Sequence, residues 1–157
     1  MVWAVAAFVP LELNAVGLQR TFTNERERVY ATAAIWSGRN LEPGALVASN
    51  EIGALGFFLP PDHGVLDLYG LLRSRSGLEV PYVELIRRQK PACVFTRTHF
   101  EHRKGIERAL PSAYSWFRFR SLYIGIRADL RARLEPRLQE LPQIYATARI
   151  DREYAWD

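Results

Sequence analysis

The stretch Ala-Leu-Val-Ala-Ser-Asn-Glu-Ile-Gly-Ala-Leu-Gly-Phe-Phe, residues 45–58, passes directly from a short apolar run into a segment with helical spacing. Residues 45–49 have the length and apolar character of a buried strand. Asn50 has the residue type of a helix N-cap, and the helix that it would begin ends before Pro60. A strand that leads straight into a helix is half of a βαβ unit, so this stretch predicts an α/β fold.

A helix is predicted immediately before this stretch, over residues 25–37. Asn24 and Glu27 have the spacing of a capping box, and Gly38 is expected to end the helix. An apolar stripe at helical spacing is formed by Val29, Ala33 and Trp36.

The chain after residue 58 continues the alternation of strands and helices. Residues 64–68 and 92–96 predict two further strands, and Pro81 begins a helix between them. All three predicted strands are continuously apolar, which is typical of a sheet buried on both faces. We therefore expect a three-layer, Rossmann-like α/β unit with a mostly parallel sheet.

The C-terminal part predicts an antiparallel hairpin followed by a helix. The pattern of paired strands occurs in residues 114–120 and 122–126. An amphipathic helix interrupted by Pro136 is predicted over residues 128–141, and weak strand character over residues 144–150. The prediction is one α/β domain over residues 1–157. Its parts are an apolar segment and connector (1–24), a βαβαβ core with its preceding helix (25–97), and a hairpin, helix and tail (98–157).

Composition excludes several classes of protein. With 157 residues, 48% of them hydrophobic and 12% aromatic, the chain can bury a core, which rules out a disordered protein. The single cysteine excludes an internal disulfide. Residues 1–9 are apolar, and they fit either a buried element or the last turns of a membrane helix. The net charge of +4 permits an anionic partner without requiring one.

The residue patterns of common catalytic and metal sites are weak or missing. Gly53 and Gly56 fall inside the predicted helix, which indicates helix–sheet packing rather than a dinucleotide-binding turn. Cys93 lies in an apolar strand, where thiols are inert packing. A metal site is suggested by His99, Glu101 and His102, but a solvated charged segment is the preferred interpretation. We expect no catalytic residue, no metal and no cofactor.

Polar residues follow the predicted strands at what would be their carboxyl ends, where open α/β sheets bind ligands. The candidate ligand-binding residues are Asn50, Glu51, Asp67, Tyr69 and Arg97. Asn50 and Glu51 would bind sugar hydroxyls, Tyr69 would stack, and Arg97 would contact a phosphate or carboxylate. Two structural interpretations compete with these roles. Glu51 would complement the dipole of the helix that follows, and Asp67 would cap a turn before Gly70.

The predicted hairpin mixes aromatic residues with arginines over residues 114–127. Such a surface can stack bases and hold phosphates, although one wet face of an ordinary sheet has the same pattern. Residues 114–120 would also form an unpaired edge, which permits a homodimer.

Residues 25–97 resemble the extracytoplasmic C-terminal domain of bacterial GT-C type integral-membrane glycosyltransferases, which use polyprenyl-phosphate sugars. The segments that carry the resemblance are Glu51-Ile52-Gly53, Asp67-Leu68-Tyr69-Gly70-Leu71 and Lys90-Pro91-Ala92. Ala92 stands where the family usually has an aspartate. The catalytic residues of the family lie in its membrane region and have no counterpart among the residues of this sequence. The resemblance implies a glycan or polyprenyl-phosphate sugar as ligand, a membrane-embedded glycosyltransferase region as partner, and a place on the extracytoplasmic face of the inner membrane.

Three functional hypotheses follow. The first is a non-catalytic domain of this glycosyltransferase-related kind that binds a glycan, an acceptor or a membrane partner. The second is a small Rossmann-like transferase that binds a nucleotide or a methyl donor at the same edge and would be cytoplasmic. The third is a nucleic-acid-binding module that uses the aromatic and arginine-rich hairpin.

Overall fold

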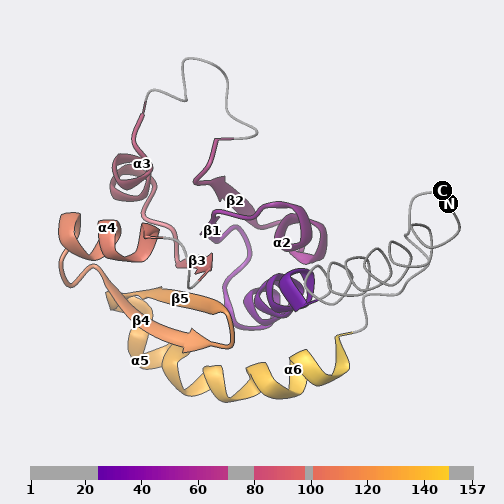
Figure 1. Ribbon diagram of the computed structural model, residues 1–157. Coiled ribbons are helices and arrows are strands. Elements are labelled where there is room, and N and C mark those ends of the chain that lie inside the picture. Colours follow the sequence, from indigo (N-terminus) through magenta and orange to yellow (C-terminus); the bar gives the residue numbers. More distant parts are fainter. Residues whose placement is uncertain (1–24, 71–79, 98–100, 149–157) are drawn as a thin grey trace, which may run out of the picture.

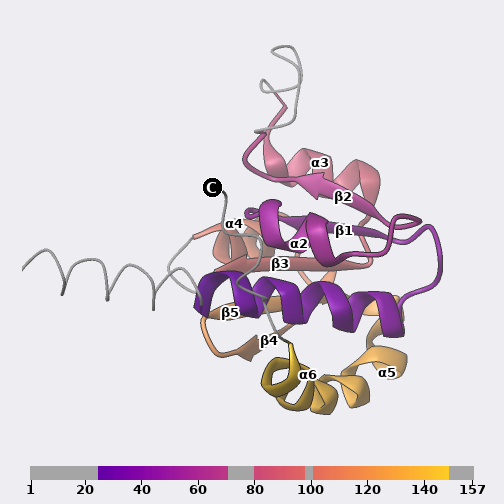
Figure 2. The same ribbon diagram turned by 90° about the vertical axis from the view of Figure 1, so that its right-hand side faces the viewer.

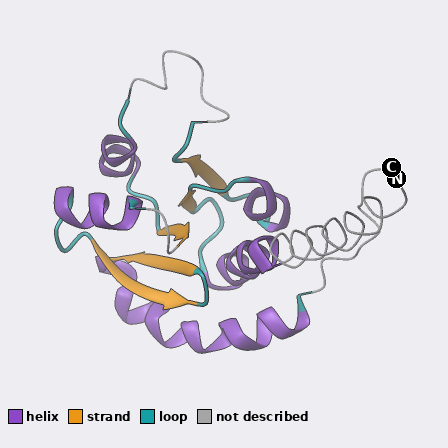
Figure 3. Cartoon of the chain, in the orientation of Figure 1, coloured by secondary structure: helices purple, strands orange, loops and turns teal. Residues whose placement is uncertain are grey.

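A five-stranded mixed sheet lies at the centre of the computed structural model, which describes residues 25–70, 80–97 and 101–148 (Figure 1). The strand order is β2-β1-β3-β5-β4. The strands are β1 (Leu46–Ser49), β2 (Gly64–Asp67), β3 (Cys93–Arg97), β4 (Tyr114–Phe119) and β5 (Leu122–Arg127). Helices surround the sheet, and the fold is α/β (Figure 3).

Strands β1, β2 and β3 pair in parallel, with β1 between the other two. Val47 of β1 lies opposite Val65 of β2 and Cys93 of β3. Both Val47 and Ala48 are fully buried although they point to opposite faces, because elements pack on both sides of this strand. The strands predicted in these three segments are confirmed, and their carboxyl ends lie at one edge of the sheet.

The sheet as a whole is not mostly parallel, and the Rossmann-like prediction is wrong. β5 pairs antiparallel with β3, and β4 pairs antiparallel with β5. These antiparallel ladders contain five and six residue pairs, against four and three in the parallel ladders. The reason is the two-residue turn at Arg120 and Ser121, which folds β5 back beside β3, where a further parallel strand would otherwise lie.

Helices lie on both faces of the sheet (Figures 1 and 2). One face carries the helix over residues 25–40, α2 (Gly53–Phe58) and the C-terminal helices, whose apolar residues share a core with Cys93 and Phe95 of β3. The other face carries α3 (Tyr82–Gln89) and α4 (His102–Ala109), which pack on Val94. Within the described ranges, none of the helices has the length and apolar character needed to cross a bilayer.

The helix over residues 25–40 continues through Gly38, which the sequence pattern predicted as its end. Instead, Gly38 allows the helix to approach Pro60 closely. A Cβ atom at this position would lie 2.5 Å from Cγ of Pro60 and 2.8 Å from its Cδ. The N-terminal cap that we predicted at Asn24 lies outside the described residues.

The C-terminal helical region is a chain of short segments, and the strand character predicted for residues 144–150 is wrong where the structure describes them. The segments are the 3₁₀ helix η2 (Ala128–Leu130), α5 (Arg131–Leu134), the 3₁₀ helix η3 (Glu135–Glu140) and α6 (Leu141–Thr147). Leu141 and Ile144 are three residues apart and both are buried in the core, a spacing that only a helix places on one face.

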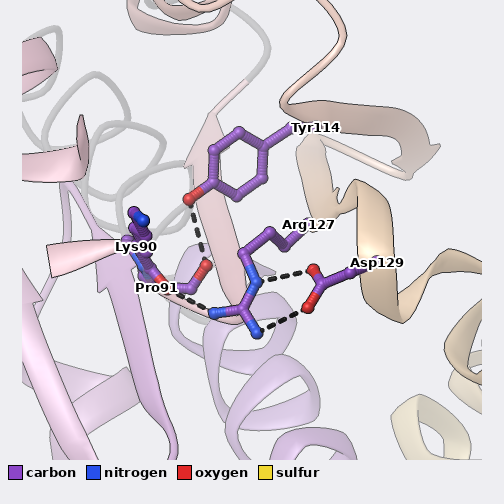
Figure 4. A network of polar contacts seen from close by, with 5 residues as sticks. All are labelled: Lys90, Pro91, Tyr114, Arg127 and Asp129. Atoms are coloured by element: carbon purple, nitrogen blue, oxygen red, sulfur yellow. Dashed lines mark hydrogen bonds and ion pairs between the residues drawn. The ribbon is translucent and has the colours of Figure 1, made fainter. Parts of the chain in front are cut away.

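A polar network joins the connection before β3 to the hairpin of β4 and β5 (Figure 4). Arg127 donates hydrogen bonds to both carboxylate oxygens of Asp129 and to the backbone carbonyl of Lys90. The Tyr114 hydroxyl donates to the carbonyl of Pro91 at 3.0 Å. These bonds satisfy carbonyl groups just before β3, so the network holds the parallel and antiparallel halves of the sheet together.

Candidate functional site

The carboxyl ends of β1, β2 and β3 carry the polar residues that the sequence singled out. Asn50 and Glu51 directly follow β1, Asp67 is the last residue of β2, and Arg97 is the last residue of β3. Since β1 lies between its two parallel neighbours, these residues are at the same edge of the sheet.

Tyr30, on the helix over residues 25–40, lies at the centre of this group. Its hydroxyl donates a hydrogen bond of 2.9 Å to Oδ1 of Asn50, and both side chains are buried. Burial raises the pKa of Tyr30 well above its usual range, and the charge of Glu51 raises it further, while Arg97 and Arg26 act in the opposite direction. The Tyr30 hydroxyl is therefore within electrostatic reach of two arginines and one carboxylate.

The group has buried donors that no acceptor satisfies. Nε of Arg26 lies 3.8 Å from Oε2 of Glu51, which is an ion pair but too long for a hydrogen bond. This Nε atom and Nδ2 of Asn50 are both buried without a hydrogen-bond partner in the part of the chain that the structure describes. Buried atoms of the same kind also occur elsewhere among the described residues, for example Oγ of Ser37 and Nε2 of His63, so these two do not by themselves mark a binding site.

Glu51 is held in place through its backbone and not by the helix that follows. The Ser49 hydroxyl accepts a hydrogen bond from the Glu51 N–H at 3.0 Å and donates one to the Glu51 carbonyl at 2.9 Å. Helix α2 has Ile52 at its N-cap, no side-chain capping bond and no acidic residue in its first turn. Both predictions about this helix are therefore wrong: Asn50 is not its cap, and Glu51 is not a first-turn partner of its dipole.

Asp67 caps the turn after β2, as one of the two interpretations predicted. Its Oδ1 accepts hydrogen bonds from the N–H groups of Tyr69, at 3.0 Å, and Gly70, at 2.8 Å. Gly70 has a φ of +80°, which suits glycine in such a turn. The effect of the Asp67 carboxylate is thus to shape the loop that presents Tyr69.

Tyr69 places an aromatic ring beside the polar group. The side chain is 42% exposed, and its ring contacts that of His102 edge to face, with centroids 5.2 Å apart. His102 in turn contacts Tyr82, with centroids 4.8 Å apart. Burial lowers the pKa of His102 and so favours its uncharged form. Its ring is part of an aromatic support for Tyr69.

The metal interpretation of the segment around His102 finds no support in the described ranges. Within them, no three His, Cys, Asp or Glu side chains are grouped so that they could hold an ion. His99, the first residue of that proposed set, lies outside these ranges.

The two glycines of α2 do not pack against the sheet, so that prediction is wrong. Gly53 and Gly56 are exposed. A Cβ at Gly53 would meet only Oε1 of Glu51 at 3.4 Å, and one at Gly56 would meet nothing within 4 Å. Instead, Leu55 points from this short helix into the core.

The arginines of the hairpin are engaged within the molecule. Arg120 lies over the ring of Tyr145, 4.0 Å from its centroid, and pairs with Glu25 at 3.6 Å. Nε of Arg118 donates to the carbonyl of Arg120 at 3.1 Å. The nucleic-acid hypothesis stays a prediction, and these contacts count against it, because they occupy charges that a phosphate backbone would need.

Sequence reasoning missed Tyr30 and Arg26 as members of the site. They are four residues apart on one helix, and so share a face. A tyrosine beside Val29 in an amphipathic helix is typical of a core residue. An arginine near the start of such a helix is typical of the solvent-exposed face. No local signal connects this helix with the end of β1, whose residues lie 20 positions further along the chain.

Comparison with known proteins identifies one family. The sequence profile of a family described as Domain of unknown function (DUF8728) matches residues 18–148. Neither the curated proteins nor the solved structures contain a match to this chain. Residues 18–148 span the described sheet and its helices, so the match covers both the fold and the residues around Tyr30.

Proposed function

Because the chain belongs to the family described as Domain of unknown function (DUF8728), we propose a function from the chemistry of its own residues: non-catalytic binding of a glycan at the carboxyl ends of β1, β2 and β3. The observation that carries this proposal is the convergence of Asn50, Glu51, Arg97 and Arg26 around the buried Tyr30 hydroxyl. In the setting that the resemblance implies, the ligand is a glycan or a polyprenyl-phosphate sugar of an extracytoplasmic glycosyltransferase.

The residue types around Tyr30 suit a polyhydroxyl ligand. Sugar hydroxyls both donate and accept, so they pair with a carboxylate such as Glu51 and with amide and guanidinium donors such as those of Asn50 and Arg97. The exposed ring of Tyr69 adds an apolar surface on which the C–H face of a pyranose can pack.

The geometry favours binding over catalysis. Paired carboxylates would be needed for general acid–base hydrolysis of a glycosidic bond. At this edge of the sheet Asp67 accepts two backbone hydrogen bonds and maintains a turn, so its role is structural. Glu51 alone does not provide the pair.

The nucleotide-binding alternative has less support. A nucleotide phosphate at the end of β1 would lie next to the carboxylate of Glu51, which stands 3.4 Å from the Cβ position of Gly53. The helix that begins there, α2, has only six residues and therefore offers little dipole.

The test is to titrate the full chain with a panel of neutral and acidic mono- and oligosaccharides and to measure the affinity of each by isothermal titration calorimetry. For a sugar of this panel that binds, we expect Tyr69→Ala to weaken its affinity by roughly 3- to 10-fold, because the substitution removes the stacking surface. The matched control is Phe57→Ala on α2, which removes the other large exposed ring of the described residues, one that is 68% exposed. Absence of binding to every sugar in the panel, or equal losses in the two variants, would contradict the proposal.

A further inference from the structure

Strand β4 lies at one end of the sheet, and its outer edge pairs with no other strand within the described ranges (Figure 1). The N–H of Ala128 donates to the carbonyl of Ala113 at 2.9 Å, so the residues of β4 that bond to β5 are those an even number of positions after Ala113. The N–H and C=O groups of Tyr114, Trp116 and Arg118 therefore point away from β5. They form a row of donors and acceptors along the edge.

This edge lacks most of the features that protect sheet edges from pairing. Strand β4 is six residues long, contains no proline, and has a single charged residue, Arg118. Its pairing with β5 runs without a bulge from Tyr114 to Phe119. Strand β2, at the opposite end of the sheet, has only four residues. Because short strands, bulges, prolines and charges are what keep edges apart, β4 is the edge that is open to another strand.

Aromatic side chains are partly exposed on both faces of this edge. Trp116 lies on the face that carries α4, and Phe117 and Phe119 lie on the face that carries α6. The ring of Trp116 lies over Gly125 of β5, where a Cβ atom would come within 2.9 Å of it. This ring therefore leans inward and does not cover the outward backbone groups. A strand added at the edge would cover apolar surface on both faces, which favours a partner strand over a small ligand.

We propose that β4 pairs with β4 of a second copy of this chain, antiparallel and centred on Trp116. Only residues with outward backbone groups can exchange hydrogen bonds, so the register must place them opposite one another. The centred register places Trp116 opposite its own copy and Tyr114 opposite Arg118 on either side. It provides two hydrogen bonds for each of these three pairs.

The position of Arg118 favours an antiparallel second copy. Its side chain is exposed and carries the only charge of the strand. In the centred register, four residues separate the two copies of Arg118, which is about 14 Å along the strand and beyond the screening length at physiological salt. A parallel pairing would bring the same two charges to within about 5 Å of each other, the distance between neighbouring strands. Only the antiparallel pairing thus avoids opposed like charges.

This pairing joins two five-stranded sheets into one continuous sheet. Antiparallel pairing reverses the direction of the second copy, so the carboxyl ends of β1, β2 and β3 lie at opposite edges in the two copies. The glycan-binding residues are therefore remote from the contact. The dimer and glycan binding are independent of each other, and each can fail alone.

The first test is sedimentation equilibrium of the full chain at protein concentrations of about 1–100 μM. We expect a particle of twice the 18.0 kDa mass of one chain, with a Kd of about 10 μM or tighter. A chain that stays monomeric over this range overturns the proposal, and the edge is then left to an extended peptide of another protein.

Arg118→Pro tests the backbone hydrogen bonds. Proline has no N–H donor, and the N–H of Arg118 points away from β5, so the substitution removes a bond to the second copy and none within the sheet. We expect the Kd of the dimer to rise about 10-fold or more, because symmetry makes the loss occur twice. The matched control is Arg118→Thr, which removes the same side chain and keeps the N–H, and it should change the Kd by less than about 3-fold.

Circular dichroism and the melting temperature establish that both Arg118 variants are folded. Equal Kd values for the two folded variants would mean that the dimer forms through another surface, which overturns the proposal.

Introduced cysteines test the register and do not depend on the proline variant. The only cysteine of the chain, Cys93, is fully buried, so an introduced thiol is the reactive one. Trp116→Cys places the thiol opposite its own copy, at a Cα separation of about 5.5 Å that a disulfide spans. Arg118→Cys places the two thiols about 14 Å apart, too far for a disulfide. We expect mild oxidation to link the first variant into dimers on a non-reducing gel and to leave the second unlinked. Any other pattern overturns the centred register.

Discussion

Gly38 and Gly56 are both glycines inside helices, yet the structure gives them opposite environments. Gly38 faces the ring of Pro60, which cannot move aside as a flexible side chain would, and Gly56 faces open space. We expect Gly38→Ala to destabilise the protein by about 1–3 kcal/mol through overpacking. Gly56→Ala should stabilise it by about 0.5–1 kcal/mol, because alanine has the higher helix propensity. Urea unfolding of the two variants measures both effects, and the same sign for both would contradict this account.

Cys93 illustrates how burial controls the chemistry of a single side chain. The thiol is fully buried in β3, and burial raises its pKa to about 12. At pH 8 we expect the folded protein to show almost no reaction with a thiol reagent such as DTNB. The same chain in guanidinium chloride should show one reactive thiol, since it contains one cysteine. Rapid labelling of the folded protein would mean that β3 is not buried as described.

Tyr30 and Arg26 show why single residues of the site escape a sequence-based search. The residues after the strands were predictable, because the carboxyl ends of neighbouring parallel strands meet at one edge. Asn50, Glu51 and Arg97 are accordingly near the same hydroxyl. That hydroxyl belongs to a helix that precedes the sheet, and its approach to Asn50 results from packing on the core rather than from any local pattern.

Among the elements, the hairpin of β4 and β5 depends on its connection to the rest of the sheet. The Tyr114 hydroxyl donates a buried hydrogen bond to the carbonyl of Pro91, just before β3. We expect Tyr114→Phe to lower the free energy of unfolding by about 1 kcal/mol, because the carbonyl loses its partner. Tyr123→Phe is the matched control on β5, since no hydrogen bond of its hydroxyl occurs within the described ranges. Equal unfolding midpoints for the two variants in urea would be inconsistent with a role for this bond.

The elements also differ in how well local pattern predicted them. The three parallel strands are short, mainly apolar runs. The segments predicted for them and for the hairpin agree with the structure to within one residue at every end. The segment around Ile144 was mistaken for a strand because short apolar runs fit either period. Ile144 is buried together with Leu141, three residues earlier, and this spacing is that of a helix.

For the whole molecule, two buried tyrosines and one buried thiol in the described part of the chain make stability depend on alkaline pH. Burial raises the pKa of Tyr30, Cys93 and Tyr114 above their ordinary values, so the folded chain retains protons that the unfolded chain releases. Their contribution to stability is complete below about pH 9 and is lost as the pH rises toward 12 and beyond. Each group lowers the free energy of unfolding by up to about 1.4 kcal/mol per pH unit in that window.

Urea unfolding at pH 8, 9, 10 and 11 tests this dependence. The expected result is a constant free energy of unfolding up to pH 9 and a steepening decline above it. Tyr114→Phe removes one of the three groups and should make the decline shallower. A flat profile up to pH 11 would show that these groups titrate alike in the folded and unfolded chains.

The amino-acid sequence by itself determined the α/β class, the three apolar strands, the hairpin and the edge at which polar residues gather. Each of these depends on the periodicity of neighbouring residues or on a turn of few residues, which a local pattern records. Tertiary structure alone decided that β5 lies antiparallel beside β3, that Gly38 faces Pro60, and that Tyr30 reaches Asn50. These features depend on contacts between segments far apart in the chain, and such contacts form only when the whole core packs.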